Sequence, residues 1–301
     1  MAVGALLFAV VLAVVWFFRR EESPEQQLAF KATRVELVSS IEVALARGSV
    51  AEKSAVLAAT DQESQKYADQ ARATALEVDR KRQDLAKLLD TGGTQREKEL
   101  LAQFSQSFAD LRRVDDEVLE LAVRGTNLKA YDLLFGPAAA ALGEMNRSLD
   151  RIAAGAGGGP DGRQVVVLAL GAETAIQRIQ ILLAPHIATE SDPKMDELEG
   201  AMRKDEEEVR RDLAALMAPP GLRGSADAAA ASSAFGRYEG IKRQILTLSR
   251  ENTNVRSLAL SLNQKRNATA LCLEALAALK QAVLDEPIPG VSYGNFPNPR
   301  R

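Results

Sequence analysis

The chain has 301 residues, 46% hydrophobic and 26% charged, which suits an ordered, water-soluble bulk with a sizeable core. Its formal net charge of −3 excludes a protein that binds nucleic acid by the electrostatics of the whole chain. A single cysteine, Cys272, excludes a disulfide within the chain. Aromatic residues make up only 5%, whereas Ala, Leu, Glu, Arg and Gln abound and favour helices, because they lose little rotamer freedom on a helix surface.

The N-terminal run AVGALLFAVVLAVVWFF, at residues 2–18, has no charged residue and is long enough to cross a bilayer. A cleaved signal peptide would need small residues at its end, whereas this run continues into FFRREE. We therefore expect an uncleaved, single-pass transmembrane anchor over residues 1–20. The side chains expected to hold it in the lipid bilayer are Leu6, Leu7, Phe8, Leu12, Trp16, Phe17 and Phe18.

The charges beside this run leave the side of the membrane open. Arg19 and Arg20 follow the span, and the positive-inside rule then favours a cytoplasmic bulk. The bias is only one or two charges, however, and long domains cross a membrane largely regardless of flanking charge. No other stretch of similar length lacks charge, so we expect everything after Arg20 on one side.

Helix starts and stops are frequent in the next part of the chain. Capping boxes, in which Glu or Gln follows Ser or Thr by three residues, begin at Ser23, Ser49, Thr60 and Thr94. Gly48, Gly92, Gly93 and Gly125 are expected stops. The predicted helices cover residues 24–47, 61–90, 94–124 and 127–153, with a short extra turn at 49–59. Pro137 is expected to kink the last of them.

One short sequence motif, called the phrase below, occurs twice. RGTNLKAYDLL starts at Arg124, and its close relative ENTNVRSLALS starts at Glu251, 127 residues later. The apolar stripe before the first phrase has counterparts at the same offset, since Phe108 corresponds to Phe235 and Leu111 to Tyr238. The stripe after it also corresponds, with Phe135 matched to Leu262 and Met145 to Cys272. We interpret the two blocks as a duplication.

Between the copies lies AAGAGGGPDG, a flexible linker by composition. The second copy is expected to open with a helix of about 164–184, ended by Pro185. The prediction is an all-α chain in which the transmembrane helix precedes two tandem antiparallel four-helix bundles. The expected domains are the anchor (1–20), bundle 1 (23–153), a Gly-rich linker (154–162), bundle 2 (163–284) and an extended Pro-rich tail (285–301).

The run FxxxFxxLxxV…VLELAVRG from Phe104 to Gly125, followed by a capped helix with a proline in it, resembles a known family. It is similar to the four-helix-bundle sensor domain of bacterial methyl-accepting chemoreceptors. The resemblance covers residues 24–153 and, more faintly, 163–284. It implies an extracytoplasmic bundle, which favours a periplasmic bulk on the bacterial inner membrane. Chemoreceptors also need a second span and a cytoplasmic signalling hairpin, so we expect this chain to need a partner to transmit a signal.

Few residues offer chemistry. His186, beside Pro185, is expected to satisfy late carbonyls at a helix end, and Cys272 to be a small core residue. The acidic run 205–208 fans around a helix, which predicts a solvated face and no cation site. We therefore expect no catalytic residue, no metal site and no cofactor. In the tail, Tyr293, Phe296 and Pro297 are candidate partner-binding residues, on an arm too short to build its own core.

These features leave three hypotheses. The leading one is a non-catalytic, membrane-anchored scaffold subunit that positions other membrane proteins in a larger complex, conceivably an electron-transfer or photosynthetic assembly. The alternative is a chemoreceptor-like domain that senses a small ligand and signals through a partner. The third is a cytoplasmic membrane tether.

Overall fold

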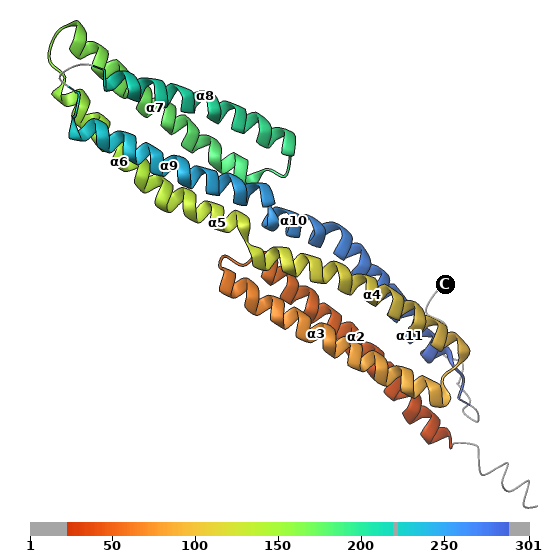
Figure 1. The fold of residues 1–301 in the computed structure, drawn as a ribbon. Helices are drawn as coiled ribbons and strands as arrows, with labels where there is room; N and C mark the ends of the chain where they lie inside the picture. Colours follow the sequence, from red (N-terminus) through yellow and green to blue (C-terminus); the bar gives the residue numbers. More distant parts are fainter. Residues whose placement is uncertain (1–22, 219–221, 289–301) are drawn as a thin grey trace, which may run out of the picture. The chain divides into compact units, whose positions relative to one another are not determined.

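A computed structural model describes residues 23–218 and 222–288 (Figure 1). Within these ranges every regular element is helical, so the predicted all-α class is confirmed. In chain order the α-helices and the π-helices η1 and η2 are α2 (Pro24–Val56), α3 (Asp61–Gly92), α4 (Gln95–Arg124), α5 (Thr126–Leu133), η1 (Leu134–Ala138), α6 (Ala139–Gly155), α7 (Pro160–Ala188), α8 (Asp192–Leu216), α9 (Ala226–Glu251), α10 (Thr253–Leu260), η2 (Ser261–Lys265) and α11 (Arg266–Asp285). The predicted anchor and the tail beyond Ile288 lie outside the described residues.

The helices divide between two compact units whose segments alternate along the chain. Unit 1 contains residues 1–51, 69–115 and 264–301. Unit 2 contains residues 52–68 and 116–263. The boundaries fall inside α2, α3, α4 and η2, so they differ from the predicted domains, which assigned each copy of the repeat to a bundle of its own.

The difference lies in the fourth helix of each copy, which packs with three helices of the other copy. In unit 1, α11 belongs to the second copy, and its Cys272, Leu276 and Leu279 join the core of α2, α3 and α4. In unit 2, α6 belongs to the first copy, and its Met145 and Leu149 join the core of α7, α8 and α9. Because every stripe has the same period, the sequence predicts which face of a helix is buried but not which helices it meets.

Two of the four predicted capping boxes form in full, and a third forms in part. In α2 the Ser23 N–H donates to Gln26 Oε1 at 3.0 Å, and the Gln26 N–H donates to Ser23 Oγ at 3.2 Å. Thr94 and Glu97 make the same reciprocal pair at the start of α4. At the start of α3, the Glu63 N–H donates to Thr60 Oγ1 at 3.2 Å. Backbone donors that a helix leaves without partners are thereby satisfied.

The fourth predicted box, at Ser49, is wrong, since α2 runs without a break from Pro24 to Val56. Gly48 was expected to end this helix. Instead a Cβ at Gly48 would lie 3.6 Å from Thr74 Cγ2, so the glycine sits where α2 packs closely against α3. Glycine costs a helix interior only about 1 kcal/mol relative to alanine, which packing of the flanking apolar residues can outweigh.

A buried ion cluster joins three helices of unit 1. The Arg34 side chain, 3% exposed, donates from Nη1 to both carboxylate oxygens of Glu97 at 2.7 Å. Its Nη2 donates to Glu286 Oε2 at 2.5 Å, just beyond α11. Lys31 Nζ donates to the carbonyl oxygens of Leu284 and Glu286 at 2.6 and 2.7 Å. The start of α2 is thus fastened to the start of α4 and the end of α11.

In unit 2 the duplicated phrase pairs with itself. The Thr126 N–H donates to Thr253 Oγ1 at 3.0 Å, and the Thr253 N–H donates to Thr126 Oγ1 at 3.1 Å. Asn127 and Asn254 repeat the exchange, each N–H donating to the other Oδ1 at 3.1 Å. The start of α5 and the start of α10 therefore cap each other, which explains why the Thr-Asn pair occurs twice.

The residue before each Thr is left-handed, with φ of 57° at Gly125 and 53° at Asn252. Glycine and asparagine are the residues that tolerate this conformation best. Asn252 has a second role, because its Nδ2 donates to the Thr189 carbonyl at 2.9 Å. Asn127 Nδ2 donates to the Ile187 carbonyl at 2.7 Å. Both side chains therefore satisfy carbonyl groups at the end of α7.

A π-helix follows each phrase, and η1 and η2 start 127 residues apart, at Leu134 and Ser261. Pro137 lies inside η1, where the α-helical hydrogen-bond pattern is interrupted, and the predicted kink at this proline stays a prediction. The extra residue in each π-helix rotates the buried stripe. Leu134 and Ser261 are buried, whereas Phe135 and Leu262, which we expected on the stripe, are 69% and 52% exposed.

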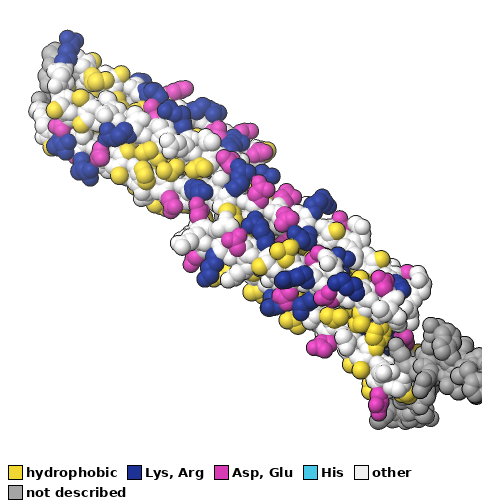
Figure 2. Space-filling model, turned by 60° about the horizontal axis from the view of Figure 1, so that its bottom comes forward, with side chains coloured by type: hydrophobic (Ala, Val, Ile, Leu, Met, Phe, Trp, Pro, Cys, Tyr) yellow, Lys and Arg dark blue, Asp and Glu magenta, His cyan; other side chains and the backbone are white. Residues whose placement is uncertain are grey.

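Charged side chains of both signs are scattered over the face of the described residues drawn in Figure 2, with hydrophobic patches between them. The even distribution agrees with the small net charge of −3. It offers no continuous basic stripe on this face of the kind that tracks a nucleic-acid backbone.

The reciprocal caps generate the first prediction. Thr126→Val and Thr253→Val each remove one cap acceptor while keeping the side-chain shape, so each should lower the free energy of unfolding by about 1–2 kcal/mol. Because the two hydroxyls share one arrangement, the double variant should lose less than the sum of the single losses, which chemical denaturation of the full chain measures. Thr247→Val is the control, since its hydroxyl bonds only within its own exposed turn. Strictly additive losses would contradict the pairing.

Candidate functional site

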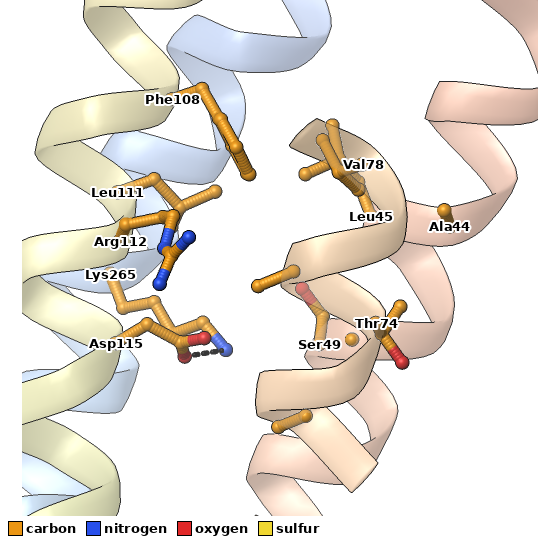
Figure 3. A pocket seen from close by; sticks show the side chains of 13 residues that line it. Ala44, Leu45, Ser49, Thr74, Val78, Phe108, Leu111, Arg112, Asp115 and Lys265 are labelled. Carbon is orange, nitrogen blue, oxygen red and sulfur yellow. Dashed lines mark ion pairs between the residues drawn. The ribbon is translucent and has the colours of Figure 1, made fainter. Parts of the chain in front are cut away.

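Unit 1 contains a small cavity, drawn in Figure 3, to which four helical segments contribute. Its volume is about 20 Å³, which is room for a single water molecule. The apolar part of its wall includes Leu45, Val78 and Phe108. The lining residues are Ala44, Leu45, Gly48, Ser49, Ala71, Thr74, Ala75, Val78, Phe108, Leu111, Arg112, Asp115 and Lys265.

An ion pair lies on one side of this cavity. Lys265 Nζ is 2.8 Å from Asp115 Oδ1, and the two side chains are only 6% and 14% exposed (Figure 3). Lys265 is the last residue of η2, and Asp115 comes from α4. π-Helical turns occur often at functional sites, because the extra residue redirects the side chains that follow. Here it accompanies a lysine on the buried side of the helix.

Arg112 is the second cation of the site. It lies one helical turn before Asp115 in α4, and Figure 3 shows its guanidinium close to the Lys265–Asp115 pair. Within residues 23–218 and 222–288, this half-buried guanidinium has no hydrogen-bond or ion-pair partner. The ionised groups of the lining are two cations and one carboxylate, so the cavity favours a negatively charged or oxygen-rich guest.

These residues are not among those predicted to form a site. In the sequence, Lys265 stands out only as half of a small basic pair with Arg266. A signal was present, however, because Asp115 lies seven residues after the buried Phe108, and Lys265 seven before the buried Cys272. Charged residues two helical turns along an apolar stripe are expected to be buried and therefore paired. The sequence alone does not show that α4 and the start of α11 belong to the same unit.

His186 lies in unit 2 and is completely buried. The prediction that α7 ends at Pro185 is wrong, since the helix spans Pro160–Ala188. Pro185 removes one N–H, and the carbonyl that loses this donor belongs to Ile181, a residue that is 70% exposed to water. The imidazole was expected to satisfy late carbonyls, but asparagine side chains do so instead.

The His186 ring bridges two other helices. Its Nδ1 is 2.8 Å from Ser249 Oγ of α9, and its Nε2 is 3.0 Å from Glu199 Oε1 of α8. Burial lowers the pKa of His186 below 6.5, and the nearby Arg250 acts in the same direction, whereas Glu199 opposes the shift. Burial tends to raise the pKa of Glu199, but hydrogen bonds from His186 and Arg250 outweigh it and lower the pKa. This buried polar group ties α7 to α8 and α9.

Cys272 is buried in unit 1, as expected of a core residue. Burial, together with the negative charge of Asp110, raises the pKa of its thiol to about 12. The acidic run 205–208 is not the solvated face that we expected. Asp205 and Glu208 bind Arg178 at 2.8 and 2.5 Å, and Glu206 pairs with the buried Lys242. Among residues 23–218 and 222–288, no cluster of three His, Cys, Asp or Glu side chains is placed to hold a metal ion.

The remaining predicted functional residues lie outside the described part of the chain. They are the seven anchor residues between Leu6 and Phe18, and the tail residues Tyr293, Phe296 and Pro297. Within the described residues, one helix is long and apolar enough to cross a membrane. It is α7, with a mean hydropathy of 1.5 over its most apolar window. One face of α7 packs in the core of unit 2.

The first copy of the repeat matches a known protein family. Residues 32–154 match the family described as a four helix bundle sensory module for signal transduction. The resemblance to a chemoreceptor sensor bundle is confirmed over these residues. The matched range is the first copy of the repeat, and the fainter resemblance of residues 163–284 stays a prediction. No curated protein matches the chain.

Most of the cavity wall therefore lies in the range that matches the family, since every lining residue except Lys265 falls within residues 32–154. The match also agrees with membrane association, because sensor modules of chemoreceptors belong to membrane proteins. It leaves the side of the membrane as a prediction.

The buried histidine generates the second prediction. Because the pKa of His186 is lower in the folded chain than in the unfolded chain, the unfolded state takes up the proton first as the pH falls. The free energy of unfolding should therefore decrease below about pH 6.5, by up to about 1.4 kcal/mol for each pH unit that separates the two pKa values. His186→Gln should flatten this decline between pH 7 and pH 5 in denaturation measurements. An unchanged slope in the variant would contradict the assignment.

Proposed function

We propose that the chain is a ligand-sensing module in which unit 1 binds a small carboxylate beside Arg112. The observation that carries the proposal is a sensor-family match over residues 32–154, in a bundle whose cavity faces Arg112, a guanidinium with no hydrogen-bond or ion-pair partner among the described residues. The scaffold hypothesis has no comparable support, because the family match favours its alternative.

The chemistry of the cavity supports an anion. An arginine side chain can donate two parallel hydrogen bonds to a carboxylate, and Lys265 adds a second positive charge nearby. Asp115 offsets one of these charges, so a ligand with a single negative charge would bring the ionised groups of the site to neutrality. A cavity of about 20 Å³ admits one water-sized group, so we propose that the charged end of the ligand replaces a water molecule there.

We further propose that binding is reported through the helices that line the cavity. Lys265 belongs to η2 and Arg112 to α4, so a ligand held by Arg112 would change the charge that surrounds the Lys265–Asp115 pair. A change in this ion pair would affect the contact between α4 and the start of α11 within unit 1. The output would pass to a partner among other membrane proteins.

The third prediction tests the ligand site. In a thermal-shift screen of organic acids, amino acids and metal ions, a carboxylate should raise the melting temperature of the full chain as its concentration rises. At a hundredfold excess over Kd the stabilisation corresponds to about 2.7 kcal/mol. Arg112→Met, which keeps most of the side-chain length without its charge, should abolish the shift. Arg113→Met is the matched control, because this neighbouring side chain is 80% exposed and should leave the shift intact.

Two outcomes of this screen would contradict the proposal. If no compound of these classes stabilises the wild-type chain, unit 1 is not a sensor for them. If a carboxylate stabilises the wild type and Arg112→Met equally, the chain binds the ligand at another place.

The fourth prediction concerns the side of the membrane. We propose a periplasmic bulk, because the sensor family favours it over the weak charge bias of Arg19 and Arg20. Protease added outside cells with a permeabilised outer membrane should then digest the helical bulk while a cytoplasmic control protein stays intact. Digestion only after the inner membrane is opened would support the cytoplasmic-tether hypothesis instead.

A further inference from the structure

Unit 1 contains a second, larger cavity, at the end where α2 starts and α11 ends (Figure 1). Its volume is about 250 Å³, whereas a single water molecule needs only about 10–15 Å³. The wall comes from the first turns of α2, from Gly92 at the end of α3, and from residues 286–288. It shares no lining residue with the cavity beside Arg112, so it is a separate place for a guest of several heavy atoms.

Two donors of this wall lack an acceptor among the described residues. Lys31 is 9% exposed, and its Nζ uses two of its three N–H groups on the carbonyl oxygens of Leu284 and Glu286. No carboxylate pairs with this ammonium in the described part of the chain. Arg34 also lines the cavity, and its buried Nε has no hydrogen-bond partner within residues 23–218 and 222–288. Buried donors without acceptors are rare and costly, so the wall favours a guest that brings oxygen acceptors.

Glu286 adds a negative charge to the same wall. Its Oε2 binds Arg34 at 2.5 Å, and the side chain stays 27% exposed, which leaves Oε1 open to a guest. The ion cluster as a whole is neutral, because Glu97 and Glu286 balance Lys31 and Arg34. A guest with a lone negative charge would disturb this balance in a largely buried site, whereas a zwitterion preserves it. The wall therefore suits a group that joins an anionic oxygen to an ammonium.

The position of the cavity along the chain indicates where such a group comes from. Gln27 of its wall follows the expected end of the anchor, residue 20, by seven residues, which span at most about 25 Å. Leu28 and Leu284, next to lining residues on α2 and α11, are 57% and 50% exposed. Exposed leucines beside a polar cavity suit a lipid, whose head group enters the cavity while its acyl chains stay with the leucines and the bilayer.

We propose that this cavity binds the phosphoethanolamine head group of a membrane phospholipid. The phosphate oxygens accept hydrogen bonds from Lys31 Nζ and Arg34 Nε, and the ammonium donates to Glu286 Oε1. The bound lipid thereby fastens the start of α2 and the end of α11 to the membrane surface. The proposal rests on the anchor predicted for residues 1–20 and is independent of the carboxylate proposed beside Arg112.

The fifth prediction compares head groups on the full chain in mild detergent. Dihexanoyl phosphatidylethanolamine should raise the melting temperature as its concentration rises, and this dependence gives its Kd. The Kd should be at least about tenfold lower than that of dihexanoyl phosphatidylglycerol, whose head group has no ammonium. Dihexanoyl phosphatidylcholine should also bind less tightly than the ethanolamine lipid, because its quaternary ammonium donates no hydrogen bond.

A water-soluble compound identifies the source of the group. Glycerophosphoethanolamine has the head group without the acyl chains, and it should bind at least about tenfold more weakly than the lipid, because the chains bury apolar surface. Equal binding would overturn the lipid assignment and make a soluble phosphoethanolamine compound the guest. If no compound shifts the melting temperature, or if the three lipids have equal Kd values, the cavity is not a head-group site.

Two variants locate the binding. Glu286→Gln keeps the side-chain shape without the charge, so it should abolish the preference for the ethanolamine over the glycerol head group. This preference is a ratio of two Kd values within one variant, so a change in the stability of the variant does not alter it. Lys31→Met should weaken the binding of every head group by at least about tenfold, since it removes a donor to the phosphate.

Lys87→Met is the matched control for the lysine variant. Lys87 belongs to α3 of unit 1 and its side chain is 76% exposed, so this variant should bind the lipids as the wild type does. A preference for ethanolamine that survives Glu286→Gln would overturn the contact between the ammonium and Glu286. Unchanged binding by Lys31→Met would show that the lipid binds at another place.

Discussion

The organisation of unit 2 depends on the mutual capping of two helix starts. A helix leaves its first N–H groups without partners inside the helix, and here Thr126 and Thr253 supply each other's missing acceptor. Such an arrangement needs two similar sequences at one place, each of which caps the other. A duplication provides both at once. It also explains why the left-handed residues Gly125 and Asn252, and the π-helices after them, recur at the same spacing.

The same junction organises the end of α7. Asn127 and Asn252 reach from the paired phrases to the carbonyl groups of Ile187 and Thr189, and Ser249 donates to the carbonyl of His186 at 2.9 Å. Each of these contacts satisfies a buried polar group that would otherwise weaken the fold. The buried imidazole of His186 is tolerated for the same reason, because both ring nitrogens have partners. One polar network therefore holds α5, α10, α9 and α7 together.

Local signals predicted much of this fold, since most helix starts, the repeat and the buried stripe of α4 are encoded within a few turns of sequence. Ser23, Thr60 and Thr94 cap helices as their patterns indicated. Non-local choices could not be predicted in the same way. Gly48 indicates a helix stop unless the neighbouring Thr74 is known, and the apolar stripe of α11 does not by itself specify which core it joins. The candidate site at Arg112 was not predicted for the same reason. Lys265 lies in it only because the fourth helix of the second copy packs with three helices of the first copy.

The two copies show how a site can arise on a duplicated frame. Position 115 is Asp and its counterpart 242 is Lys, whereas position 265 is Lys and its counterpart 138 is Ala. Each unit therefore has a buried lysine in an ion pair, but Lys242 of unit 2 pairs with Glu206 of α8.

The counterpart of Arg112 is Glu239, which Arg210 neutralises in unit 2. In unit 2 the charged residue at this position is thus paired within the chain, whereas in unit 1 the guanidinium of Arg112 faces a cavity. Among the described residues Arg112 has no such partner, and this difference between the two copies supports the anion site that we propose for unit 1.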